Sequence, residues 1–166
     1  MPRTLTSAAT AEKDKTTGAV PLFVLEIQYG GGTGTKYYSD QADTGSIYPV
    51  TVDPRVVEWG KLTTQADGSR IGGYGQTSIK LADPDLSLKT LFDTSPGVQN
   101  KAVFIHLWFA GTAWSDRVTI FGGFVSAPTT WDDSDGLWSL TVRGFEEYYN
   151  RTIGLPYTRT VFPELV

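Results

Sequence analysis

The segment that most constrains the fold is residues 102–109, which read Ala-Val-Phe-Ile-His-Leu-Trp-Phe. Aromatic and aliphatic side chains fill one set of alternate positions, and this period of two is typical of a β-strand. The other set holds Phe104, His106 and Trp108, so both faces of the strand are largely apolar. Such a strand needs cover on both sides, and we expect it to be the most buried strand of the fold.

Several other segments show the same alternation, and glycine, Asp-Pro or Asp-Gly turns separate them. Alternating runs bounded by turn residues predict strands. The further predicted strands cover residues 22–29, 35–39, 47–52, 55–64, 76–82, 117–126 and 137–145. Together with residues 102–109 they make about eight short strands at regular spacing, which indicates a mainly β fold, an antiparallel β-barrel or β-sandwich.

A single short helix is expected between these strands, at residues 86–92. Leu88, Leu91 and Phe92 follow helical spacing there, and Asp83 or Asp85 can accept hydrogen bonds from the first N–H groups of the helix. Within residues 117–126, Gly122 and Gly123 predict a β-bulge, because adjacent glycines in a strand often mark one.

The chain divides into three parts by composition. Residues 1–20 are small and polar and form an N-terminal arm, residues 21–149 form the β-barrel domain, and residues 150–166 form a C-terminal extension. Residues 7–13 of the arm have two interpretations. They form a short helix with Ser7 as N-cap, or they remain a flexible arm that becomes ordered on a partner.

Composition excludes several classes of protein. The sequence has no cysteine, so disulfides, thiolate nucleophiles and cysteine-ligated zinc are excluded. The formal net charge is −4, which leaves no basic surface for specific nucleic-acid or anionic-membrane binding. The first 15 residues lack the apolar core of a secretory signal, and residues 102–110 are too few to span a bilayer. We therefore expect a soluble protein without a membrane partner.

Two glycine-rich segments superficially suggest phosphate binding. Residues 30–36 contain Gly-Thr-Lys, but a phosphate loop needs Gly-Lys-Ser/Thr opening a helix, and here a strand follows. Residues 72–75 lack a following helix as well, so they do not make a dinucleotide fingerprint. We interpret the first segment as a hairpin loop and the second as a bulge or loop.

The acidic run at residues 132–135, followed by Gly136, has the oxygen-rich character of a calcium loop. The distal bidentate glutamate of such a loop is missing, and Asp and Gly are common turn residues for other reasons. A solvated hairpin turn is the favoured interpretation.

The sequence contains few candidate catalytic residues. The single histidine, His106, lies in the middle of a predicted strand, and no Gly-x-Ser-x-Gly nucleophile motif accompanies it. Glu146 and Glu147 are adjacent in sequence and point in different directions, although a spatial carboxylate pair of the kind used by glycosidases stays open. We predict a protein that is not an enzyme and needs no cofactor or metal.

Aromatic residues supply the candidate binding contacts. We assign Trp108 and Trp138 to the core, because both lie within predicted strands. Trp114 and Trp131 lie beside loops and are candidates for contact with a protein partner or a glycan.

The C-terminal extension is apolar where a free terminus is normally polar. Its prolines at 156 and 163 disfavour a helix or a central strand. We therefore expect the extension to lie along another surface, and we name Tyr157, Val161, Phe162 and Leu165 as candidate partner contacts.

The order of these pieces resembles the β-barrel domains of tail-tip and baseplate-hub proteins of long-tailed bacteriophages. The resemblance covers most of residues 20–150. It rests on loose patterns, which are the strand at 22–27, Lys36-Tyr37-Tyr38, Trp59-Gly60-Lys61-Leu62, the "Leu-x-Asp" element at 79–83, the helix at 86–92, the aromatic strand at 104–109, Ile120-Phe121-Gly122-Gly123-Phe124-Val125, and the strand at 138–142 running into 143–149.

This resemblance implies a virion structural protein in a ring below the tail tube, assembled in the host cytoplasm and bound to tail-tube, distal-tail or tip proteins. Hub proteins of this type are usually trimers and distal-tail rings are hexamers, so a homo-oligomer, with a trimer favoured, is expected. Such hubs are generally longer, which makes this chain a short member or a fragment. The alternative function is a carbohydrate-binding β-sandwich module of a receptor-binding protein.

Overall fold

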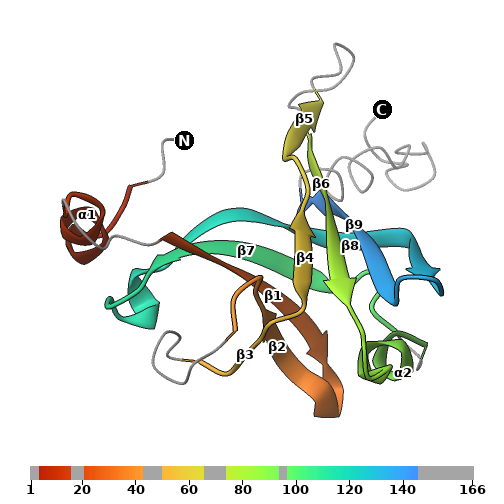
Figure 1. The fold of residues 1–166 in the computed structure, drawn as a ribbon. Helices are drawn as coiled ribbons and strands as arrows, with labels where there is room; N and C mark the ends of the chain where they lie inside the picture. Colours follow the sequence, from red (N-terminus) through yellow and green to blue (C-terminus); the bar gives the residue numbers. More distant parts are fainter. Residues whose placement is uncertain (1–3, 16–20, 43–49, 66–73, 94–96, 146–166) are drawn as a thin grey trace, which may run out of the picture.

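A computed structural model of the chain describes residues 4–15, 21–42, 50–65, 74–93 and 97–145 (Figure 1). In chain order, the helices and strands of these residues are α1 (Ser7–Lys13), β1 (Pro21–Gly30), η1 (Gly31–Thr33), β2 (Gly34–Tyr38), β3 (Val52–Asp53), β4 (Val56–Trp59), β5 (Thr63–Gln65), β6 (Tyr74–Ala82), α2 (Ser87–Asp93), β7 (Ala102–Phe109), η2 (Trp114–Asp116), β8 (Val118–Asp132) and β9 (Leu137–Gly144). Here η marks a short 3₁₀ turn.

The described strands form one curved sheet. Its order is β3-β2-β1-β7-β8-β9-β6-β4, with β5 paired to β6. The pairing of β2 with β3 is parallel and the other pairings are antiparallel. The prediction of a mainly β fold is confirmed.

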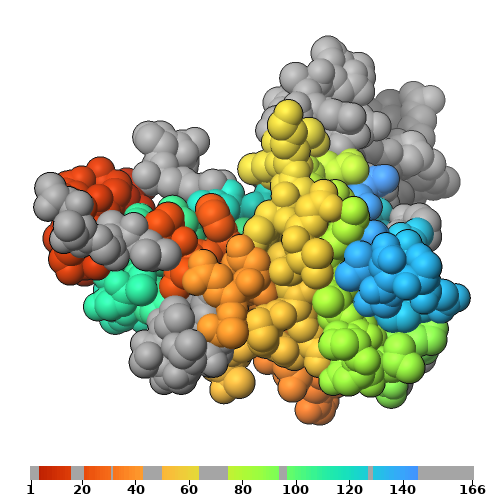
Figure 2. All heavy atoms as spheres, viewed as in Figure 1, coloured from red at the N-terminus to blue at the C-terminus, as the bar shows by residue number. Residues whose placement is uncertain are grey.

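The sheet curls but does not close into a barrel, so the structure favours the sandwich-like alternative. Its two ends approach one another where the Val56 N–H donates to the Ser39 carbonyl oxygen at 2.8 Å. Nearby, the rings of Phe23 and Trp59 lie 6.0 Å apart, which joins β1 to β4 by side chains alone. Figure 2 shows the orange and yellow segments of β2 to β5 side by side on this face.

The main core lies within the curve of the sheet. Strands β1, β6, β7, β8 and β9 and helix α2 contribute its buried side chains, which include Leu25, Ile27, Ile79, Leu81, Leu88, Phe92, Val103, Ile105, Phe121, Val125, Trp138, Leu140 and Val142. Burial of this much apolar area is the main stabilising contribution to the fold.

A second, smaller cluster covers the outer face of β1 and β7. It consists of buried Leu22, Val24, Val52 and Trp108, with partly buried Tyr37 and Trp114 packed against them. This cluster explains why residues 102–109 are apolar on both faces, as predicted. The predicted core positions of Trp108 and Trp138 are confirmed, since both side chains are buried.

The N-terminal segment contains a helix, α1, in addition to the predicted α2. Its N-cap is Thr6, not Ser7, because the Thr6 Oγ1 accepts the Ala9 N–H at 3.2 Å. Ala9 is fully buried, so α1 packs on the domain and does not form a free arm over residues 7–13.

The predicted bulge at Gly122 and Gly123 is wrong. These residues pair in register with Phe104 and Val103, and the register shifts instead fall between Ile105 and His106 and within residues 126–130. A Cβ at Gly123 would overlap the carbonyl oxygen of Arg143, so glycine there permits close approach of two strands. Strand β8 also continues to Asp132, which shortens the predicted turn.

The predicted strand at 55–64 is divided into β4 and β5. The division occurs at Gly60, whose N–H donates to the Ser78 carbonyl oxygen at 2.8 Å. A Cβ on Gly60 would overlap that same oxygen, so the chain passes close to β6 here, and β4 and β5 both pair antiparallel with β6 on either side of this point. Of the strand predicted at 47–52, residues 47–49 lie outside the described part, and β3 is Val52–Asp53.

Candidate functional site

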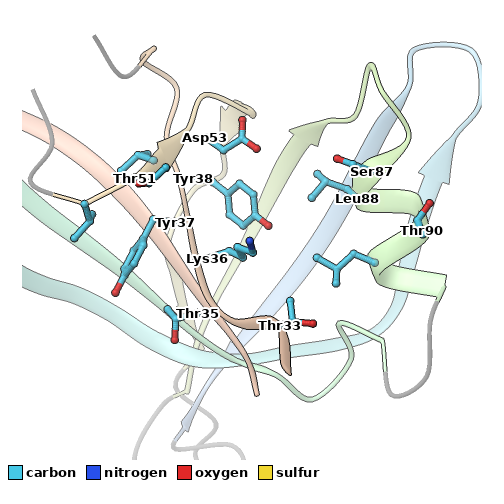
Figure 3. Close-up of a pocket in the computed structure, with 13 residues that line it drawn as sticks. Thr33, Thr35, Lys36, Tyr37, Tyr38, Thr51, Asp53, Ser87, Leu88 and Thr90 are labelled. Atoms are coloured by element: carbon cyan, nitrogen blue, oxygen red, sulfur yellow. The ribbon is translucent and has the colours of Figure 1, made fainter. Parts of the chain in front are cut away.

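A groove of about 1130 Å³ opens between β2 and β3 on one side and α2 on the other (Figure 3). Its lining comes from Thr33, Thr35, Lys36, Tyr37, Tyr38, Val50, Thr51, Val52, Asp53, Ser87, Leu88, Thr90 and Leu91. Hydroxyl and aliphatic side chains dominate this set, and the ionisable side chains are Lys36, Asp53 and the two tyrosines. A concave surface of mixed polarity is suited to binding.

Strand β2 forms one wall of the groove. Figure 3 shows Lys36 and Tyr38 projecting toward α2, whereas Thr35 and Tyr37 project from the opposite side of the strand. Strand β3 pairs only with Tyr37 and Tyr38. Among the described strands, none pairs with Gly34–Lys36 on the edge away from β1, and these three residues are exposed.

Helix α2 forms the opposite wall, and Arg55 fixes its position. The Asp83 carboxylate accepts the N–H groups of Leu88 at 2.9 Å and Lys89 at 2.6 Å, which confirms the predicted cap. Arg55 Nη1 donates to Asp83 at 3.1 Å and to Asp85 at 2.9 Å. The turn between β3 and β4 is thus bound directly to the start of α2.

The charges of the groove are unevenly compensated. The Asp53 carboxylate accepts a hydrogen bond from Arg55 Nε at 2.6 Å. Lys36 has no ion-pair partner in the part of the chain that the structure describes, and its side chain is exposed. Burial raises the pKa of Tyr38 to about 12, so this hydroxyl is neutral and contacts Tyr29 Oη at 3.1 Å. The groove therefore contains one lysine without an ionic partner among the described residues, close to a cluster in which three carboxylates share the single Arg55 guanidinium.

A second polar cluster lies on the outer face of the sheet. His106 Nε2 lies 3.0 Å from Glu26 Oε2, and His106 Nδ1 lies 3.1 Å from Thr119 Oγ1. Gln28 Nε2 donates to the other Glu26 oxygen at 2.7 Å. His106 is only 3 % exposed, and it lies within a strand, as predicted. Its burial lowers the pKa of the imidazole, against the opposing effect of Glu26.

The order hydroxyl, imidazole, carboxylate resembles the arrangement of a hydrolase triad. Two observations favour a structural role. Glu26, His106 and Thr119 do not line the groove, so this cluster lies apart from the concave surface described above. Thr119 and His106 are also directly paired residues of adjacent strands, and a buried polar side chain needs such a partner wherever it lies.

Trp114 belongs to this outer cluster and is not a free surface ring. Its ring lies 5.6 Å from Tyr37 and 5.7 Å from His106, in edge-on geometry. The Arg117 guanidinium lies 4.7 Å from its centroid. These neighbours favour a packing role for Trp114.

Trp131 packs at a different place, against the main core. Its ring lies 5.2 Å from that of Trp138, Lys89 Nζ lies 5.4 Å from its centroid, and its indole N–H donates to Asp133. The structure thus separates Trp114 and Trp131 into two clusters and does not combine them into one glycan-stacking platform. The remaining candidates Tyr157, Val161, Phe162 and Leu165 lie outside the described residues.

The acidic loop before β9 is a turn, as predicted. The Asp132 carboxylate accepts both the N–H and the hydroxyl of Ser134. In the described ranges, no three His, Cys, Asp or Glu side chains gather closely enough to hold a metal ion. Across the helices that the structure describes, none combines the length and apolar character needed to cross a membrane.

Sequence reasoning missed the groove and its main residues, Lys36 and Arg55. Their roles depend on β2, the β3–β4 turn and α2 meeting in space, and no local pattern signals that meeting. The Asp-Pro-Asp run at 83–85 was the one usable signal, because it predicted the cap that receives Arg55.

Comparisons with known proteins identify a fold and no family. No protein-family model matches the sequence, and no curated protein matches it. Among solved structures, the chain is similar to a chain described as "Virion of native gene transfer agent (GTA) particle", with a TM-score of 0.59 and 15 % identity. The alignment covers 93 % of this chain and 48 % of the other. The chain thus spans about half the length of that neighbour, and the two share a fold.

Proposed function

We propose that this protein is a structural subunit of a phage-like virion and that it acts by protein–protein assembly, without catalysis. The observation that carries the proposal is the shared fold with a chain of a gene transfer agent virion, which extends over 93 % of this chain. Fold alone does not define function. The sequence also resembles tail-tip and baseplate-hub domains of long-tailed bacteriophages, and this resemblance supports the same kind of particle.

Within the virion we place the subunit at the tail tip or baseplate, as a hub or distal-tail ring component bound to neighbouring tail proteins. The exposed apolar side chains of Phe23, Val57, Leu62 and Leu86 provide contact area of the kind that interfaces use. Tyr157, Val161, Phe162 and Leu165 of the C-terminal extension are proposed as further contacts. A homotrimer is favoured over a hexamer.

Immunogold electron microscopy of particles that contain this protein tests the location. Antibodies against the purified chain are expected to label the end of the tail distal to the head. Label on the head, or none on particles that assemble normally, would contradict the proposal.

Light scattering of the purified chain tests the assembly state. The expected mass is three times the subunit mass of 18.1 kDa, and replacement of Val161 and Phe162 by aspartate is expected to reduce it. A mass of one subunit at high protein concentration for the unmodified chain would count against ring assembly.

A further inference from the structure

The groove between β2 and α2 has a strand edge along its wall that no other described strand pairs with. Strand β1 pairs with one side of β2 throughout, whereas β3 covers only Tyr37 and Tyr38 on the other side. Alternate residues of a strand direct their main-chain groups to opposite edges, so only alternate residues of the exposed stretch Gly34–Lys36 present N–H and C=O groups to the groove. Such groups are satisfied by water or by another extended chain.

Side chains around that edge are arranged in two rows, which matches the alternation of a strand. One row, on the α2 side, contains Lys36 with the aliphatic Leu88 and Leu91 of the helix. The other row contains Thr35 and Tyr37, which Figure 3 shows on the opposite side of β2. A strand laid along β2 alternates its side chains between these two rows.

The charged side chains of the groove determine which kind of peptide segment fits best along β2. The exposed Lys36 has no ionic partner among the described residues, whereas Asp53, which pairs with Tyr38 at the end of β2, shares Arg55 with Asp83 and Asp85. The row that faces α2 thus combines the positive charge of Lys36 with the partly exposed aliphatic side chain of Leu91. A segment with a carboxylate beside aliphatic residues complements this row, and a segment with a lysine at the same position is repelled.

We infer that the groove binds an extended, acidic segment of a neighbouring polypeptide by β-strand addition to Gly34–Lys36, with a carboxylate of that segment paired to Lys36. Strand addition obtains affinity from main-chain hydrogen bonds and specificity from alternate side-chain positions. The inference rests on the proposed function only for the source of the segment, which would be another protein of the particle.

Fluorescence anisotropy with the full chain provides the test. The probes are labelled eight-residue peptides of alternating valine and threonine, one with a central glutamate and one with a central lysine. The glutamate peptide is expected to bind saturably and the lysine peptide at least tenfold more weakly. Lys36→Glu is expected to reverse this order, and Lys61→Glu, which changes an exposed lysine outside the groove lining, is expected to preserve it. Equal binding of both peptides, or no binding of either, overturns the inference.

N-methylation of the glutamate peptide separates strand addition from simple charge attraction. Alternate N–H groups of a strand point to opposite edges, so methylation of one alternate set is expected to abolish binding and methylation of the other to leave it within twofold. In NMR spectra of the complex, the amide signals of Gly34, Thr35 and Lys36 are expected to shift most. If the peptide binds equally well with either set of N–H groups methylated, or if the largest amide shifts occur at other residues, the inference is overturned.

The peptide-binding experiments can fail or succeed independently of the electron-microscopy test of the proposed function. Tail-tip labelling in electron microscopy does not depend on peptide binding. Loss of the labelling result with intact peptide binding refutes the placement at the tail tip alone, and the converse refutes strand addition alone.

Discussion

Arg55 Nη1 lies 3.1 Å from Oδ1 of Asp83, whose side chain is fully buried. The same carboxylate caps α2 through the N–H groups of Leu88 and Lys89. One side chain therefore joins the β3–β4 turn to the helix, and the helix is held opposite β2. This pair therefore helps to hold α2 across the groove from β2, together with the packing of Leu88 and Phe92 in the main core.

Replacement of Asp83 by asparagine is expected to destabilise the fold by about 3 kcal/mol, the lower end of the range for a broken buried ion pair. The lower end applies because Arg55 keeps Asp53 and Asp85 as partners. The free energy of unfolding from urea titration measures the loss. Asp85→Asn removes an exposed partner of Arg55 and is the matched control, with a smaller expected loss. Equal losses in the two variants would contradict the role assigned to Asp83.

Stability is expected to fall as the pH drops below about 6.5, and His106 is the cause. Burial lowers the pKa of His106 in the folded state, so the unfolded chain binds the proton more readily between that lowered pKa and the ordinary value near 6.5. Stability then rises with pH across this window and falls with acidification. The contribution of His106 is fully present above the window.

Thermal unfolding of the wild type and His106→Gln between pH 5 and pH 7.5 measures this effect. His106 is the single histidine of the sequence, so the difference between the two curves reports this side chain. The wild-type melting temperature is expected to fall more steeply on acidification than that of the variant. Parallel curves would show that protonation of His106 does not oppose folding.

Gly123→Ala is expected to destabilise the fold by about 1–3 kcal/mol, as overpacking does. The new Cβ overlaps the Arg143 carbonyl oxygen, so β8 and β9 must separate. Gly32→Ala is the control, because a Cβ there meets nothing within 4 Å. Chemical denaturation of both variants checks the prediction, and a stable Gly123→Ala protein would show that the two strands do not approach as closely as described.

The sequence predicted the elements whose signal is local. Residues 102–109 were predicted to be a strand and form β7 in the structure. The prediction succeeded because the alternating apolar side chains of this segment are the same side chains that pack on the two faces of the sheet. The cap at Asp83 was also predicted, because it precedes its helix by a few residues. The division of residues 55–64 at Gly60 was not, since it depends on a contact with Ser78 on another strand. The groove was missed for the same reason, because Lys36 and Leu88 are distant in sequence.

Trp114 provides the last prediction, which separates packing from partner binding. The ring contacts Tyr37, His106 and Arg117, so Trp114→Ala is expected to cost about 2–3 kcal/mol of unfolding free energy, less than a fully buried tryptophan because the ring is partly exposed. Trp114→Phe keeps an aromatic ring and is expected to lose less. Val57→Ala, at a side chain that is 58 % exposed, is the surface control and is expected to change stability by about 0.5 kcal/mol or less. If Trp114→Ala unfolds like the wild type but fails to assemble, Trp114 is a partner contact and the packing role assigned to it is wrong.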